Sequence, residues 1–156
     1  MRMDSERPHS ALSDSMDLRN QFYHFCLTFL HQPYRWGGDD PMAGFDCSGL
    51  ILELYQFLLL APRGDRTAQQ IYEFFKNESH RGYRKIGALA FYGKGKESIT
   101  HIAMFLDENR IIEAGGGGRD TTTLDAAVKR NAFVRIRYYL DRTDLVDVLV
   151  PDRLPI

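Results

Sequence analysis

Residues 33–50 read PYRWGGDDPMAGFDCSGL, and the rest of the chain is best interpreted outward from this stretch. Its glycines and prolines favour an irregular loop over residues 32–46. A loop of that length within a compact domain is usually functional. From Ser48 to residue 60 the chain is strongly apolar, with no glycine or proline after Gly49, which predicts a buried helix. Cys47 therefore lies where the loop ends and the helix begins.

Cys47 is the candidate nucleophile. A helix N-terminus presents unsatisfied N–H groups and a partial positive charge, and both favour a thiolate over a thiol. The same N–H groups can hold an oxyanion during attack on a carbonyl. The second cysteine, Cys26, lies between Phe25 and Leu27 on an apolar helical face, so we expect it to be buried packing. A disulfide between the two cysteines would remove the nucleophile.

His101 is the candidate base, because it is the histidine that heads a predicted strand in the second half of the chain. A hairpin of residues 100–106 and 110–114 would place His101 opposite Ala114. Glu113 would then lie within one position of His101. A carboxylate there can orient the imidazole and raise its basicity, so Glu113 is the candidate third residue of a triad.

The pattern of the whole chain predicts helices first and strands second. Helices are predicted over residues 17–31, 48–60 and 67–77, the last with Thr67 near its cap and Ile71, Phe74 and Phe75 facing inward. Strands are predicted over residues 85–93, 100–106, 110–114, 133–139 and 145–150, with a helical turn at 124–129. This order predicts an α+β domain in which N-terminal helices pack on a mostly antiparallel sheet of five to six strands.

The composition bounds the function. The chain has 156 residues, with 20 Lys and Arg against 21 Asp and Glu, and a formal net charge of −1. This balance argues against a nucleic-acid-binding protein or an electrostatic membrane anchor. No stretch is apolar and long enough to span a membrane, and no metal-binding spacing occurs, so we expect no transmembrane segment, no metal and no cofactor. Oligomeric state is left open.

The start of the chain carries no apolar core of a signal peptide. Residues 1–16 are predicted to be a disordered polar lead, and residues 17–156 a single catalytic domain. Localisation stays open between a cytoplasmic enzyme and export through a trimmed signal, a phage or a secretion system.

The motifs resemble the nucleophile signature of NlpC-type cell-wall cysteine peptidases. The resemblance rests on PYRWGG at residues 33–38 and GFDCSGL at residues 44–50. Three later stretches match in order, namely RTAQQ at 66–70, GALAF at 87–91 and HIAMFL at 101–106. It implies a papain-like fold and hydrolysis of peptidoglycan stem peptides at the bond between D-glutamate, through its side-chain carboxyl, and a diamino acid.

The resemblance also implies roles for single residues. Tyr34 would support the oxyanion, and Asp46 and Ser48 would line the subsite for the free amine of the stem peptide. Trp36 is interpreted as core packing. The third catalytic position of such enzymes is most often His, sometimes Asn or Gln, whereas Glu113 occupies it here.

Two other functions remain open from the sequence. One is a thiol acyltransferase or amidase acting on lipids or other amides; its relatives often place the histidine before the cysteine, which disfavours it here. The other is a non-catalytic binding or assembly module, for example in a phage tail.

The four glycines at residues 115–118 lack the Lys-Ser/Thr of a phosphate-binding loop, and we interpret them as a mobile turn bordering the active-site cleft.

Overall fold

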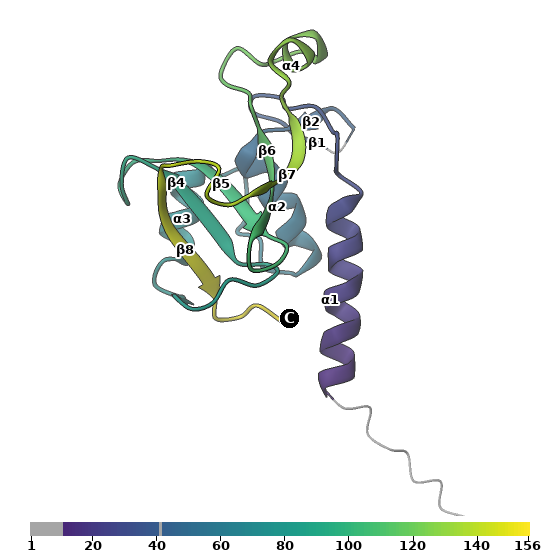
Figure 1. Cartoon of the computed structure of the whole chain (residues 1–156), viewed down its shortest axis with the longest axis vertical. Coiled ribbons are helices and arrows are strands. Elements are labelled where there is room, and N and C mark those ends of the chain that lie inside the picture. The colour runs from purple at the N-terminus through teal and green to yellow at the C-terminus, as the bar shows by residue number, and fades with distance from the viewer. Residues whose placement is uncertain (1–10, 41) are drawn as a thin grey trace, which may run out of the picture.

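The computed structural model describes residues 11–40 and 42–156 and has an α+β architecture, as predicted (Figure 1). The helices in those ranges are α1 (Ala11–Leu27), α2 (Cys47–Phe57), α3 (Ala68–Phe75) and α4 (Leu124–Arg130). The strands there are β1 (Asp39–Asp40), β2 (Gly44–Phe45), β3 (Ser79–His80), β4 (Leu89–Gly93), β5 (Ile99–Phe105), β6 (Arg110–Gly115), β7 (Phe133–Tyr138) and β8 (Leu145–Pro151).

The main sheet has six strands in the order β3-β8-β4-β5-β6-β7, and each neighbouring pair is antiparallel. All five predicted strands occur, although β4 begins at Leu89 rather than at residue 85. The sixth strand, β3, has only two residues, and a segment that short carries no hydrophobic periodicity from which to predict it.

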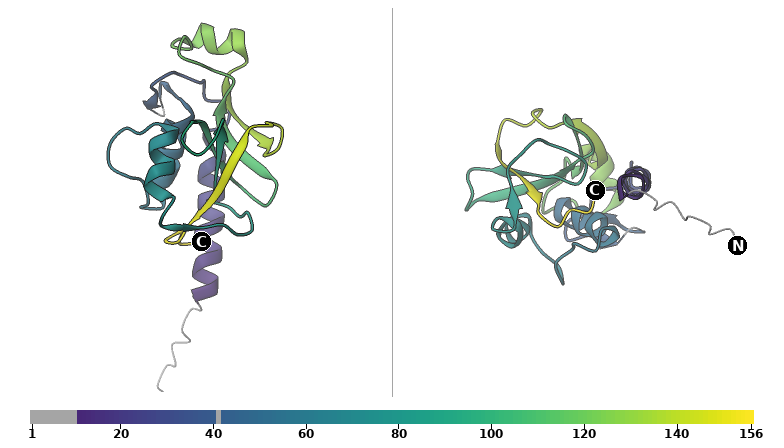
Figure 2. Two further views of the ribbon diagram at one scale, coloured as in Figure 1. Left: turned by 90° about the vertical axis from the view of Figure 1, so that its left-hand side faces the viewer. Right: turned by 90° about the horizontal axis from the view of Figure 1, so that it is seen from below.

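Helices α2 and α3 cover one face of this sheet, and the main core lies between them and the strands (Figure 2). Alternate strand residues point toward the helices, as the two-residue period of a strand requires. Side chains on this face include Leu89, Phe91, Ile102, Met104 and Ile112. The other face carries a smaller apolar cluster that includes Ala90, Tyr92, Ala103, Phe105 and Ile111.

Helix α1 packs against α2 through aromatic side chains. Phe22 and Phe25 lie with their ring centroids 5.5 Å and 4.7 Å from that of Phe57. The helix begins at Ala11, so the prediction of a disordered lead is wrong for residues 11–16; residues 1–10 lie outside the described residues. The stretch ALSDSM combines good helix formers with an acidic residue in the first turn, and both favour a helix without tertiary packing.

The carboxyl ends of α1 and α2 come earlier than predicted. Helix α1 ends at Leu27 instead of residue 31, because His31 adopts a positive φ of 71° and donates its N–H to the Val134 carbonyl. Helix α2 ends at Phe57 instead of residue 60, and Leu59 has a φ of 58°. Positive φ is incompatible with a right-handed helix, so neither helix can continue through these residues.

Helix α3 begins after Thr67, which caps it with a full capping box, as expected. Ile71 and Phe75 are buried, but Phe74 is exposed and the prediction that it faces inward is wrong. The buried face of α3 instead includes Tyr72, whose ring contacts Phe91 of the sheet.

Candidate active site

The N-terminus of α2 is fixed by Asp46, the residue before Cys47. The Asp46 carboxylate accepts hydrogen bonds from the Gly49 N–H at 2.7 Å and from the Gly37 N–H at 3.1 Å. The first satisfies a helix N–H that has no intrahelical acceptor, and the second ties the glycine loop to the helix. Asp46 therefore fixes the position of Cys47 through one bond to the helix and one bond to the preceding loop.

Close backbone packing explains Gly49, two residues after Cys47. A Cβ built on Gly49 would lie 2.0 Å from the Gly38 carbonyl oxygen, so only glycine fits where α2 meets the loop. Gly38 also accepts a hydrogen bond from the Asp46 N–H at 3.0 Å. The backbone N–H groups of Cys47 and Ser48, at the start of α2, have no carbonyl acceptor within the helix.

His101 and Glu113 form a buried pair on β5 and β6. The His101 Nε2 lies 2.6 Å from the Glu113 Oε2, and the two residues are 7% and 1% exposed. Because β5 and β6 pair Met104 with Ile112, the register is one residue from the predicted one. That difference matters: in this register Glu113 lies on the same face as His101, whereas the predicted register would turn it to the other face.

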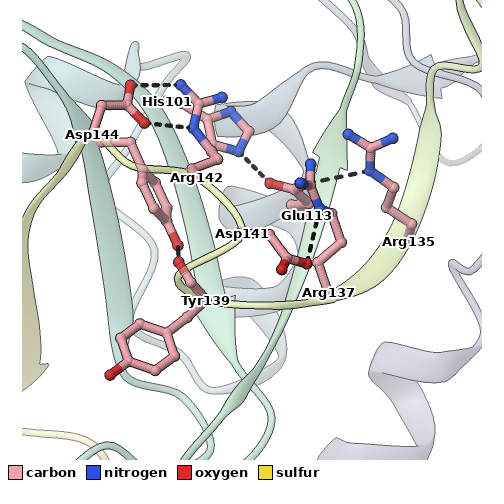
Figure 3. A network of polar contacts seen from close by, with 9 residues as sticks. His101, Glu113, Arg135, Arg137, Tyr139, Asp141, Arg142 and Asp144 are labelled. Atoms are coloured by element: carbon pink, nitrogen blue, oxygen red, sulfur yellow. Dashed lines mark hydrogen bonds and ion pairs between the residues drawn. The ribbon is translucent and has the colours of Figure 1, made fainter.

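Two arginines on β7 hold the other oxygen of Glu113 (Figure 3). The Glu113 Oε1 accepts hydrogen bonds from the Arg135 Nε at 3.2 Å and the Arg137 Nη1 at 3.3 Å. Burial alone would raise the pKa of Glu113, but the contacts with His101 and the two arginines outweigh it and hold the pKa at about 2. The carboxylate is therefore ionised at any working pH.

The sequence did not predict these arginines. They lie two residues apart on β7 and so share one face, which is the signal that the stretch VRIRY offers. Their partner follows only from the pairing of Glu113 with Arg135 across the strands, and the sequence alone does not fix that register.

His101 also contacts Cys47. Burial alone would lower the pKa of His101, but its hydrogen bonds with the Cys47 thiol and the Glu113 carboxylate raise it from 6.5 to about 9. Because Nε2 faces Glu113, Nδ1 is the ring nitrogen available to the thiol. The ring also lies against Tyr92, with centroids 5.6 Å apart. A protonated imidazole beside a thiol stabilises the thiolate.

The cleft above Cys47 has a volume of about 680 Å³ and brings together five of the six predicted site residues, namely Tyr34, Asp46, Cys47, Ser48 and His101. Glu113 does not line it and lies behind His101. The four glycines at residues 115–118 border the cleft, in line with their predicted place. Trp36, predicted to be core packing, is 47% exposed and lines the cleft, so that prediction is wrong. Trp36 lies in the loop between α1 and β1 (residues 28–38), called the rim loop below. The Arg119 guanidinium lies over the Trp36 ring, 5.9 Å from its centroid.

Tyr34 and Ser48 flank the cysteine. Burial, together with the nearby Cys47 and Asp46, raises the pKa of the Tyr34 phenol well above its usual 10, so the phenol stays a neutral hydrogen-bond donor. The Ser48 hydroxyl lies 3.2 Å from the Asp46 Oδ1 and donates to it. The second cysteine, Cys26, is fully buried, which raises its pKa to about 12, and both cysteines are free.

None of the helices in the described ranges combines the length and apolar character that crossing a membrane requires.

Comparisons with known proteins identify the family of the chain. The family model described as the NlpC/P60 family matches residues 31–138. The chain is 30% identical over 133 residues to the bifunctional muramidase/DL-endopeptidase CwlT of Bacillus subtilis, covering 83% of this chain and 39% of that protein. It is 33% identical to the probable endopeptidase YafL of Escherichia coli, covering 70% of this chain and 45% of that protein. The chain thus spans less than half the length of these curated relatives.

Solved structures show the same fold. The peptidoglycan hydrolase RipB of Mycobacterium tuberculosis aligns with a TM-score of 0.63 at 17% identity, over 96% of this chain and 74% of that one. RipD of the same organism, described as a non-catalytic NlpC/p60 domain protein adapted to peptidoglycan binding, aligns with a TM-score of 0.62 at 20% identity, over 85% of this chain and 95% of that one.

Proposed function

We propose that this chain, which belongs to the NlpC/P60 family, is a cysteine endopeptidase that hydrolyses an amide bond in peptidoglycan stem peptides. The observation that carries the proposal is the buried His101–Glu113 pair, with His101 lining the same cleft as Cys47 at the start of a helix. A thiol, an imidazole and an orienting carboxylate in that order are the parts of nucleophilic acyl transfer. The curated relatives CwlT and YafL are named as endopeptidases.

The proposed reaction has two halves. The Cys47 thiolate attacks the scissile carbonyl carbon, and the oxyanion is held by the backbone N–H groups at the start of α2 and by the Tyr34 hydroxyl. The imidazolium of His101 gives its proton to the leaving amine, and the C–N bond breaks to leave a thioester. Neutral His101 then takes a proton from water, which attacks the thioester carbonyl and releases the acid and Cys47.

The proposed bond joins D-glutamate, through its side-chain carboxyl, to a diamino acid. Asp46 and Ser48 line the cleft beside Cys47 and would meet the free amine of a stem peptide. Both Asp46 oxygens already accept backbone hydrogen bonds, and a carboxylate oxygen can accept more than one, so the amine and the helix cap can share this carboxylate.

The fold by itself does not separate cleavage from binding, because RipD has this fold and is described as non-catalytic. Here the thiol of Cys47 and the imidazole of His101 line one open cleft, and Cys47 is among the groups that raise the pKa of His101, which supports cleavage. Among the residues that the structure describes, no contact favours an acyltransferase over a hydrolase.

The test is to incubate the protein with purified muropeptides and to read product masses. The expected result is two fragments, formed by cleavage of the D-glutamyl–diamino acid bond, whose masses add up to that of the substrate plus one water. Cys47→Ala and His101→Ala should form neither fragment. Cleavage by Cys47→Ala at the wild-type rate would overturn the mechanism.

Alkylation of the native protein with iodoacetamide at pH 6 gives an independent check. One adduct is expected, at Cys47, while the buried Cys26 reacts only after unfolding. An unreactive Cys47 would instead support a binding module.

A further inference from the structure

One cleft residue, Arg142, is not used by the proposed reaction. It lies in the turn between β7 and β8 and lines the cleft together with His101. Its Nε and Nη2 donate to the two carboxylate oxygens of Asp144 at 2.9 Å and 2.8 Å. The guanidinium also lies over the Tyr92 ring, 5.2 Å from its centroid. Both contacts fix its direction, and within the described residues no hydrogen bond is found for Nη1.

Arg142 lies beside the catalytic imidazole. The Tyr92 ring contacts both the guanidinium and the His101 ring, and Arg142 and His101 both line the cleft. The other two arginines of the cleft are held on its rim: Arg66 donates to the Arg63 carbonyl, and Arg119 lies over Trp36. The Asp144 carboxylate is the first cause, and Glu113 a smaller one, that raises the pKa of Arg142 above its usual value.

The reaction assigns a direction to the cleft. The imidazolium of His101 must reach the nitrogen of the leaving amine, so the leaving fragment lies on the His101 side. The acyl fragment lies on the side of Cys47 that carries Asp46 and Ser48. Arg142 therefore faces the leaving fragment, and Asp46 faces the acyl fragment.

We propose that Arg142 binds a free carboxylate on the leaving fragment and thereby sets the substrate preference of the site. This inference rests on the proposed function and refines it. A guanidinium with two donors fixed on Asp144 and one nitrogen directed elsewhere is suited to a carboxylate. The preferred leaving fragment is a diamino acid with a second, free carboxylate, such as diaminopimelate, over lysine or a carboxamide.

The test compares wild type, Arg142→Gln and Arg142→Lys on matched substrates. The substrates are three tripeptides whose C-terminal α-carboxylate is amidated: L-Ala-γ-D-Glu-diaminopimelate, the same peptide with its second carboxylate converted to a carboxamide, and the L-lysine peptide. Wild type is expected to show about tenfold higher kcat/KM on the carboxylate peptide, mainly through a lower KM, because a charge-assisted hydrogen bond at a partly exposed site contributes on that scale. Arg142→Gln is expected to bring this ratio close to one, and Arg142→Lys to give an intermediate ratio.

The outcomes separate recognition from scaffolding. Arg110→Gln is the matched control, because Arg110 forms a surface pair with Asp107 far from the cleft, and it should keep the wild-type ratio. If Arg142→Gln lowers kcat/KM equally on both peptides, or if wild type does not discriminate, the assignment is wrong.

If the protein cleaves none of the peptides, the proposed function is wrong. Peptide binding then still tests the role of Arg142. Calorimetry with Cys47→Ala compares the carboxylate and carboxamide peptides with and without Arg142→Gln. A carboxylate preference that depends on Arg142 supports the assignment even then, and equal or absent binding overturns it.

Discussion

Glu113→Gln keeps the size of the side chain and removes the charge that faces His101. In the folded protein the pKa of His101 is about 9 against an ordinary 6.5, and Cys47 and Glu113 are the partners that raise it against burial. Glu113 supplies part of that rise, so the loss of its charge brings the pKa of His101 down by about 1 to 2, to roughly 7 to 8.

The expected readout is the pH profile of kcat/KM on a muropeptide. In wild type the alkaline limb falls near pH 9, where the imidazolium loses its proton and the thiolate loses its partner. In Glu113→Gln this limb moves to roughly pH 7 to 8, and kcat/KM at the optimum falls by about 10²-fold, the scale of a general acid–base contribution. Glu108→Gln is the matched control, because Glu108 is exposed in the turn of the same hairpin.

Stability gives a second readout with a defined sign. His101 has a folded pKa above its ordinary value, so its stabilisation is complete below pH 6.5 and is lost as the pH rises through about 9. Glu113 has a folded pKa below its ordinary value, so its stabilisation is present above pH 4.5 and is lost as the pH falls through about 2. Between pH 6 and pH 9 the wild type should therefore lose more free energy of unfolding in urea than Glu113→Gln does. An alkaline limb that stays near pH 9 in Glu113→Gln would refute the coupling of the two residues.

Three further changes test the supports of the site. Replacing Arg135 and Arg137 together by Gln removes the two arginine partners of the buried Glu113 carboxylate. We expect the free energy of unfolding in urea to fall by about 2 kcal/mol and the alkaline limb of the kcat/KM profile to shift to higher pH. An unchanged limb would show that the arginines do not act on the His101–Glu113 pair. Gly49→Ala should cost about 1–3 kcal/mol by overpacking against the loop carbonyl 2.0 Å away, while Gly95→Ala, with no atom within 4 Å of a built Cβ, should be neutral; equal effects of the two would contradict the close packing. Asp46→Ala removes the cap of α2 and its tie to the glycine loop, for a loss of about 1–2 kcal/mol together with lower kcat/KM, and retention of full activity would argue against its place beside the substrate.

The parts of the site that were predictable are those set by local sequence. Asp46, Cys47 and Gly49 form a helix start, and a capping pattern depends on neighbours within a few residues. The hairpin of β5 and β6 was also local, because a short turn joins its strands. Its register was wrong by one residue, since a turn of three or four residues allows more than one pairing.

The parts that were missed depend on contacts between segments distant in sequence. Trp36 is apolar and aromatic, which favours a core position, yet the rim loop that carries it leaves it half exposed beside Arg119. Arg135 and Arg142 became part of the site only through the pairing of β7 with β6 and the turn that follows β7. Periodicity assigned the strands without their order, and the order decides which charges meet.

Strand order also determines which charges surround Glu113, the proposed third residue of the site. A lone buried carboxylate near the reacting carbonyl would oppose the negative charge that develops on the substrate oxygen. Here the two oxygens of Glu113 are divided: Oε2 meets His101, and Oε1 meets Arg135 and Arg137. Because two guanidinium groups face one carboxylate, the cluster behind the imidazole carries no net negative charge. Glu113 can thus orient His101 without repelling the oxyanion, and the glutamate and the arginine pair work as one unit.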